Sequence, residues 1–141
     1  MKKNHLDIYI DGASKGNPGH AGVGAVVCRG DEVVKNISAY IGEATNNCAE
    51  YTALLYALQE ALLQKAQSVA VRTDSELLYR QLKGLYKVKN VNILGLFNRA
   101  KHLIAGFAEF SISHIPRENN RGADKLANLA VKAHLKKVFD R

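Results

Sequence analysis

The sequence predicts one α/β domain with a mixed five-stranded sheet flanked by helices, and three observations support this prediction. Residues 5–41 contain three apolar runs joined by short connections, which predicts three antiparallel strands. The remainder alternates short apolar runs with helical periodicity, which predicts parallel strands joined by crossovers. The 141 residues suffice for one core and show no repeat or linker, so we expect a single domain over 1–141.

The antiparallel part of the sheet is expected from alternating apolar and polar residues. Leu6, Ile8 and Ile10 alternate with more polar positions over 5–11, as in a half-buried strand. Residues 12–20 are rich in Gly and contain Pro18, which favours a turn. Two further strands are expected over 21–28 and 32–41.

The second part of the chain begins with a helix over 46–66, capped by Asn46 or Asn47. Its apolar positions form one stripe, as expected for a helix that packs on a sheet. The remaining expected elements are a strand over 68–73, a short helix from Ser75 to Leu82, a connector over 85–92, a helix over 93–106, a strand over 109–115, a loop over 116–122 and a helix over 123–138 with Leu126, Leu129, Ala130 and Ala133 facing inward.

The composition favours a polyanion as partner and a reducing compartment. The net charge is +7, from 20 Lys and Arg against 13 Asp and Glu, and such a surface attracts nucleic acid. Cys28 and Cys48 lack the spacing of a zinc site and are interpreted as ordinary thiols. We find no apolar signal region and no membrane-spanning run, so a cytoplasmic protein without membrane contact is expected.

Four acidic residues occupy positions that disfavour acids. Asp11 closes a predicted strand, Glu50 lies inside an amphipathic helix, Asp74 ends another strand and Asp124 opens the last helix. The carboxyl ends of parallel strands meet at one edge of a sheet, where α/β proteins bind ligands. Clustered carboxylates repel unless a cation neutralises them, and an all-oxygen set favours Mg²⁺ or Mn²⁺. The alternative is four unrelated surface carboxylates.

At these residues the chain resembles the type 1 ribonuclease H family, and the resemblance extends over about residues 5–135. The form resembled lacks the basic protrusion of better-known bacterial members, because the corresponding stretch is only residues 83–90 and the chain has no Trp. The matching blocks are Asp11-Gly12-Ala13-Ser14-Lys15-Gly16-Asn17-Pro18-Gly19, Thr45-Asn46-Asn47-Cys48-Ala49-Glu50, Thr73-Asp74-Ser75, Pro116-Arg117-Glu118-Asn119, and Ala123-Asp124 with Leu126-Ala127.

The resemblance implies an endoribonuclease that hydrolyses the RNA strand of RNA–DNA hybrids and leaves 5′-phosphate and 3′-hydroxyl ends. It implies that Asp11, Glu50, Asp74 and Asp124 are the catalytic residues and the ligands of two Mg²⁺ or Mn²⁺ ions in the substrate complex. Bound metals of this kind activate water and absorb charge on the leaving oxygen. The expected substrate is the hybrid, with double-stranded RNA as a further candidate, and the expected state is a monomer.

The resemblance also implies residues that hold the hybrid in its minor groove, where 2′-hydroxyls distinguish RNA from DNA. These substrate-binding residues are Gly12, Ala13, Ser14, Asn17, Asn46 and, where many relatives have Gln, Glu76.

Two questions stay open at the level of the sequence. His114 precedes Asp124 and is a candidate assistant in proton transfer, although Arg117 or Glu118 on the following loop are alternatives. The alternative function is a non-catalytic nucleic-acid-binding module on the same fold. A third is a resolvase- or transposase-type nuclease.

Overall fold

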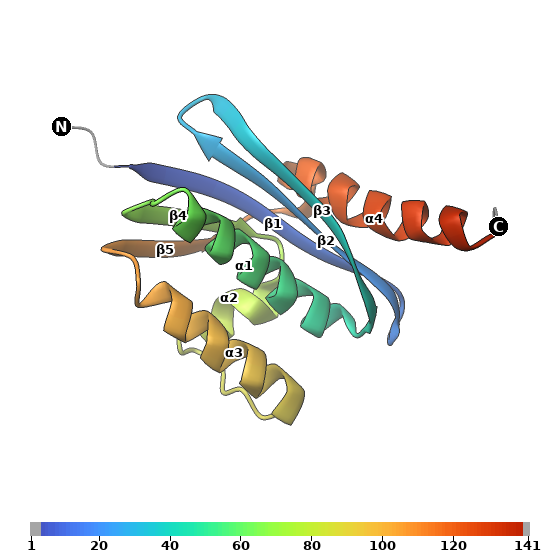
Figure 1. Ribbon diagram of the computed structural model, residues 1–141. Coiled ribbons are helices and arrows are strands. Elements are labelled where there is room, and N and C mark those ends of the chain that lie inside the picture. Colours follow the sequence, from blue (N-terminus) through green and yellow to red (C-terminus); the bar gives the residue numbers. More distant parts are fainter. Residues whose placement is uncertain (1–3, 140–141) are drawn as a thin grey trace.

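The computed structural model describes residues 4–139 and arranges five strands in one sheet with helices on both faces (Figure 1). The strand order is β3-β2-β1-β4-β5. β1 pairs antiparallel with β2, which pairs antiparallel with β3, whereas β1, β4 and β5 are parallel. The predicted mixed sheet is therefore confirmed. The strands are β1 (His5–Gly16), β2 (Gly19–Arg29), β3 (Glu32–Ala44), β4 (Ser68–Thr73) and β5 (Glu109–His114).

The helices divide between the two faces of this sheet. α1 crosses one face with α3 packed beside it, and α4 lies across β2 and β3 on the other (Figure 1). Within the described part of the chain, no helix combines the length and apolar character needed to cross a membrane. The helices are α1 (Asn46–Leu63), α2 (Glu76–Leu82), α3 (Val91–Ile104), the short 3₁₀ helix η1 (Arg117–Asn119) and α4 (Arg121–Phe139).

The first hairpin is longer than the sequence predicts. The prediction of a turn over 12–20 is wrong, because β1 continues to Gly16 and β2 begins at Gly19. The register runs unbroken from Gly12 opposite Val23 to Gly16 opposite Gly19, which leaves a two-residue turn. Cross-strand hydrogen bonding, which has no signature in local composition, keeps these glycines in the sheet.

Thr45, not an asparagine, caps α1. Its hydroxyl oxygen accepts a hydrogen bond from the backbone N–H of Cys48 at 3.2 Å, the usual arrangement at a helix start. The predicted cap at Asn46 or Asn47 is therefore wrong. Because Thr45 takes this role, the Asn46 side chain is free to bond elsewhere.

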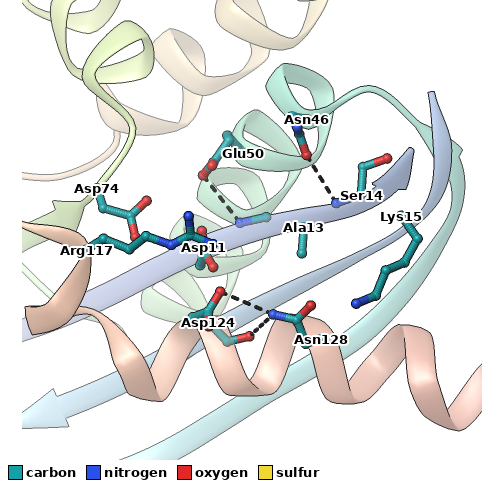
Figure 2. A pocket seen from close by; sticks show the side chains of 11 residues that line it. Asp11, Ala13, Ser14, Lys15, Asn46, Glu50, Asp74, Arg117, Asp124 and Asn128 are labelled. Carbon is teal, nitrogen blue, oxygen red and sulfur yellow. Dashed lines mark hydrogen bonds between the residues drawn. The ribbon is translucent and has the colours of Figure 1, made fainter. Parts of the chain in front are cut away.

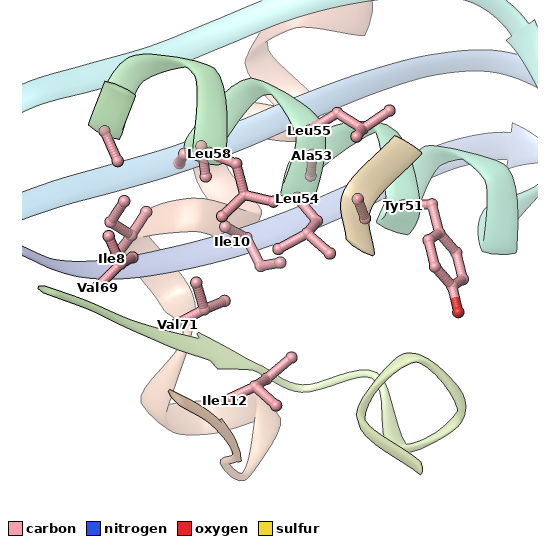
Figure 3. Close-up of a cluster of buried hydrophobic side chains, with 14 of the residues drawn as sticks. Ile8, Ile10, Tyr51, Ala53, Leu54, Leu55, Leu58, Val69, Val71 and Ile112 are labelled. Atoms are coloured by element: carbon pink, nitrogen blue, oxygen red, sulfur yellow. The ribbon is translucent and has the colours of Figure 1, made fainter. Parts of the chain in front are cut away.

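The core lies between α1 and the sheet (Figure 3). Leu54 and Leu58 of α1 pack against apolar side chains of β1 and β4, including Ile8 and Ile10, and all four are fully buried. Burying such a side chain stabilises the fold by about 1.5–3 kcal/mol. This packing fixes α1, and with it Glu50, relative to β1.

Glycines allow both helices to approach the sheet at close range. A Cβ on Gly12 would lie 2.3 Å from the backbone carbon of Ala49 in α1. A Cβ on Gly24 would lie 2.1 Å from the backbone oxygen of Ala123 in α4. Gly12 pairs with Val23, so Gly24 faces the opposite side of the sheet from Gly12. The two close contacts thus bring α1 and α4 to either face of β1 and β2 at nearly the same level.

Candidate active site

The register of the parallel strands places two acids side by side. Ile10 and Thr73 form the last pair of β1 and β4, so Asp11 and Asp74 are the next residues on their strands. Beyond this point β1 pairs only with β2. The other edge of β1 is therefore open next to Asp11, and side chains from both faces of the sheet can reach it.

Glu50 reaches this open edge from α1. It is the fifth residue of the helix, and the backbone N–H of Gly12 donates to its Oε2 at 3.3 Å. Only a glycine at position 12 permits this contact, because a Cβ there would also lie 2.5 Å from the backbone nitrogen of Glu50. Asp11 thus supplies one carboxylate, and the lack of a side chain at Gly12 leaves room for the Glu50 carboxylate beside it.

Asp124 arrives from the opposite face, in the first turn of α4. Its backbone N–H donates to the carbonyl of Asn120 at 3.1 Å, which begins the helix. The side-chain amide of Asn128, one turn later, donates to Asp124 Oδ1 at 3.1 Å and to the Asp124 carbonyl at 2.9 Å (Figure 2). A carboxylate in the first turn also lies in the favourable field of the helix N-terminus.

The structure brings the four predicted acids to one pocket of about 480 Å³ (Figure 2). Carboxylate oxygens of Asp11, Glu50 and Asp74 all lie within 4.8 Å of one another. Asp124 is outside that group of three, but its carboxyl is close enough to Asp11 to raise the pKa of Asp11. Asp11, which is only 5% exposed, thus interacts with all three other acids. The lining residues are Asp11, Gly12, Ala13, Ser14, Lys15, Asn46, Glu50, Asp74, Arg117, Asp124 and Asn128.

Electrostatics in this pocket favour protonated carboxyls or a bound cation. Burial, the negative charge of Asp74 and the hydrogen bond with Asp124 raise the pKa of Asp11 to about 8. Burial, followed by the charges of Asp11 and Asp74, raises the pKa of Glu50 well above its ordinary value. The Gly12 N–H and the positive charge of Arg117 act in the opposite direction on Glu50.

The donor set suits a hard divalent cation. It consists of carboxylate oxygens, and no His or Cys lies in the pocket lining. Mg²⁺ and Mn²⁺ prefer such ligands, whereas zinc sites are rich in His and Cys. A divalent cation would also offset the charge repulsion that, after burial, raises the two pKa values.

The predicted substrate-binding residues lie in three places, which are the acidic pocket, a second pocket beside it and, for Glu76, neither of the two. Gly12, Ala13, Ser14 and Asn46 line the pocket, and the Ser14 N–H donates to Asn46 Oδ1 at 3.2 Å (Figure 2). Asn17 lies outside the pocket lining, although its Oδ1 accepts from the Asn46 N–H at 3.1 Å. It lines a second pocket of about 340 Å³, together with Thr45, Lys87 and Lys89 among others.

Glu76 is placed apart from the acids. Its side chain is exposed, forms an ion pair with Arg80 at 2.8 Å and does not line either of these two pockets. The ion pair joins positions i and i+4 of α2, where such pairs are common.

The two candidate assistants also occupy different places. His114 ends β5, stacks on Tyr79 and has its Nε2 3.3 Å from the backbone oxygen of Asp74. Arg117, on η1, lines the acidic pocket, whereas Glu118 does not. Arg117 is therefore the member of this loop that is placed to act on the acids or on a bound anion.

Sequence reasoning missed two asparagines that bond to the acids. Asn120 donates to Asp74 Oδ2 at 3.3 Å, and Asn128 donates to Asp124. Asn128 could have been identified, because it stands four residues after Asp124 on the same helix face. Asn120 has no such local pattern, since its side chain bonds to Ile10 and Asp74, which are far away in the sequence.

Sequence comparisons match nearly the whole chain to one family model and to curated relatives. A family model described as reverse transcriptase-like matches residues 9–130. Ribonuclease HI of Halobacterium salinarum is 44% identical over 127 residues, which cover 89% of this chain and 64% of that protein. A bifunctional protein of Mycobacterium tuberculosis is 42% identical over 128 residues, which cover 89% of this chain but 35% of that protein. The chain thus spans only part of the length of these two relatives.

Structural comparisons agree over nearly the whole domain. The crystal structure of RNase H1 from Halobacterium salinarum superposes with a TM-score of 0.89 at 42% identity, covering 92% of this chain and 98% of that one. LC11-RNase H1 in complex with an RNA/DNA hybrid gives 0.88 at 40% identity, covering 92% and 99%. These neighbours confirm the predicted ribonuclease H-like fold.

Proposed function

Because this chain belongs to the type 1 ribonuclease H family, we propose that it is an endoribonuclease that hydrolyses the RNA strand of RNA–DNA hybrids. The proposed products carry 5′-phosphate and 3′-hydroxyl ends. The observation that carries this proposal is the group of carboxylates from Asp11, Glu50 and Asp74, within 4.8 Å of one another in an open pocket. A relative whose structure contains an RNA/DNA hybrid supports the choice of substrate.

In this proposal the four acids hold two Mg²⁺ or Mn²⁺ ions when substrate is bound. Asp11 interacts with all three other acids, since its carboxylate lies within 4.8 Å of those of Glu50 and Asp74 and its pKa is raised by Asp124. Bound divalent ions supply Lewis-acid activation of water and neutralise charge that develops on the phosphodiester. The side chains contribute fixed orientation, because they are carried by strands and helices that pack on one core.

The backbone around Gly12, Ala13 and Ser14, together with Asn46, is proposed to contact the minor groove of the hybrid. These residues line the acidic pocket, and the Oδ1 of Asn46 accepts from the Ser14 N–H, which fixes the orientation of the Asn46 side chain. Lys87 and Lys89 in the neighbouring pocket offer positive charge to a phosphate backbone. Hydrogen bonds to 2′-hydroxyls would select the RNA strand.

A cleavage assay tests this function directly. Labelled RNA–DNA hybrid, RNA duplex and DNA duplex are each incubated with the protein in Mg²⁺, in Mn²⁺ and in EDTA. We expect cuts in the RNA strand of the hybrid with metal only, and no cuts by Asp74→Asn. Asp31→Asn, on the exposed turn between β2 and β3, serves as the matched control and should cut normally.

The outcomes separate the candidate functions. Binding of the hybrid without cleavage in either metal would support the non-catalytic module instead. Undiminished turnover by Asp74→Asn would contradict the assignment of the acids. Cleavage of the RNA duplex beside the hybrid would add double-stranded RNA to the substrates.

We also propose that residues 1–141 act as one domain and as a monomer. All the described elements share one sheet and its two helical layers. Light scattering measures the mass in solution, and a dimer would contradict this part of the proposal.

A further inference from the structure

Asn120 joins three of the four acid-bearing segments. It lies directly before α4 and is only 1% exposed. Its Nδ2 donates to the carbonyl of Ile10 at 2.8 Å and to Asp74 Oδ2 at 3.3 Å. Its own backbone carbonyl accepts from the N–H of Asp124 at 3.1 Å. One residue thus contacts Asp74, Asp124 and the residue immediately before Asp11.

The position of Asn120 follows from the sheet register. Ile10 and Thr73 are the last pair of β1 and β4, so the Ile10 carbonyl lies where the pairing of these strands ends. A buried carbonyl needs a donor, and the Asn120 amide supplies it. The same amide group holds the carboxylate of Asp74, the first residue after the pairing ends. The Asn120 side chain therefore pairs with the carbonyl at the end of the β1–β4 pairing and orients the neighbouring Asp74 carboxylate.

The oxygen of the Asn120 side chain indicates that the Nδ2 donor is the functional part of this amide. Its Oδ1 is buried and has no hydrogen-bond partner among residues 4–139. An unpaired buried amide oxygen is unfavourable, and proteins keep such groups mainly where they serve a function.

Asn128 does for Asp124 what Asn120 does for Asp74. Its Nδ2 donates to both the Oδ1 and the carbonyl of Asp124, and it lines the acidic pocket (Figure 2). The amide donor fixes which oxygen of the carboxylate faces the cavity. The amide itself carries no charge and does not titrate, so it orients the acid without bringing a positive charge into the pocket.

We propose that Asn120 and Asn128 are positioning residues that aim the Asp74 and Asp124 carboxylates into the pocket before a divalent cation binds. This inference rests on the proposed function. Without the amides, each carboxylate would be free to rotate away from its neighbours, because carboxylates crowded together repel. Partners that hold metal-binding side chains contribute about 10- to 100-fold to metal affinity or activity.

The decisive variant is Asn128→Ala, because it should fold at least as well as the parent. Ala has a higher helix propensity than Asn, and Asn128 is half-buried within α4. We expect unchanged or higher thermal stability without metal, about 10-fold weaker Mn²⁺ binding by calorimetry, and a lower kcat with a similar KM for hybrid. Asn128→Gln keeps an amide that can reach Asp124 and should restore much of both.

Asn120→Ala tests the proposed role of Asn120 at Asp74, and Asn119→Ala on the same loop is the exposed control. We expect the Asn120 variant to bind Mn²⁺ about 10- to 100-fold more weakly while the control matches the parent. If Asn120→Ala does not fold, Asn128→Ala alone decides. Parental Mn²⁺ affinity and kcat in Asn128→Ala would overturn the inference. A parent that neither binds Mn²⁺ nor cuts hybrid would overturn the proposed function instead.

Discussion

Replacing Asp11 by Asn should stabilise the metal-free protein at neutral and alkaline pH. The pKa of Asp11 is raised from 3.8 to about 8, chiefly by burial and by the neighbouring Asp74 and Asp124 carboxylates. Between these values the folded protein holds a proton that the unfolded chain has released. The free energy of unfolding therefore falls as pH rises from about 4 to about 8.

The magnitude follows from the size of this shift. A change of about four pKa units corresponds to about 5 kcal/mol of lost stability at pH 8. Asn has the shape of the protonated acid and carries no negative charge that the neighbouring carboxylates would repel. The amide carries its own unfavourable burial, so we expect a net gain of about 2–4 kcal/mol at pH 8. At pH 4 the parent and Asp11→Asn should have similar stability.

Urea unfolding in EDTA at pH 4 and pH 8 measures both effects. Asp31→Asn, in an exposed turn, should leave stability unchanged at either pH and controls for net charge. Saturating Mn²⁺ should reverse the order, since the parent gains binding energy that Asp11→Asn largely lacks. Equal destabilisation of Asp11→Asn at both pH values in EDTA would refute this account of the pocket.

Three further predictions concern residues around the acids. Gly12→Ala should lower the free energy of unfolding by about 1–3 kcal/mol in urea titrations and weaken Mn²⁺ binding, because the added Cβ must push α1 away. Arg117→Gln should raise the pKa of Glu50 further, which carboxyl NMR titration of the metal-free protein would detect, with Arg117→Lys as the control that keeps the charge. Glu76→Gln should release Arg80 from its ion pair, so KM for hybrid should fall and become more salt-dependent, whereas unchanged salt dependence would place Arg80 away from the substrate.

Much of the fold could be predicted because hydrophobic periodicity reflects which face of each element is buried. The alternation of Leu6, Ile8 and Ile10 and the stripe of α1 correspond to fully buried side chains, apart from Leu62 at the end of the helix. In α4 the prediction that Leu129 and Ala133 face inward is wrong, since Leu129 is 51% exposed and Ala133 is also exposed. The buried residues of α4 are instead Ala123, Ala127, Ala130 and Val131.

The physical reason for the error in α4 lies on another strand. Gly22 and Gly24 of β2 let the α4 backbone approach so closely that little besides Ala fits between them. Size, not hydrophobicity, therefore selects the buried face, and no property of the helix sequence alone shows this. The same holds for Asn120, whose two acceptors are 110 and 46 residues away in the chain.

The four acids could be proposed as site residues because strands and the buried faces of helices disfavour charged side chains. The structure shows which contacts keep the four acids in these positions. Repulsion among the clustered carboxylates acts to separate α1, β1, β4 and α4. The opposing contacts are the apolar core beneath α1, the close approach of α4 at Gly24, and the amides of Asn120 and Asn128. These contacts hold the carboxylates in an arrangement that is unfavourable without a cation. The fold therefore preorganises the site, and less free energy is lost in arranging the ligands when a cation binds. Stability of the empty domain and affinity for metal should therefore change in opposite directions for substitutions at the acids, and in the same direction for substitutions in the apolar core and at Gly24.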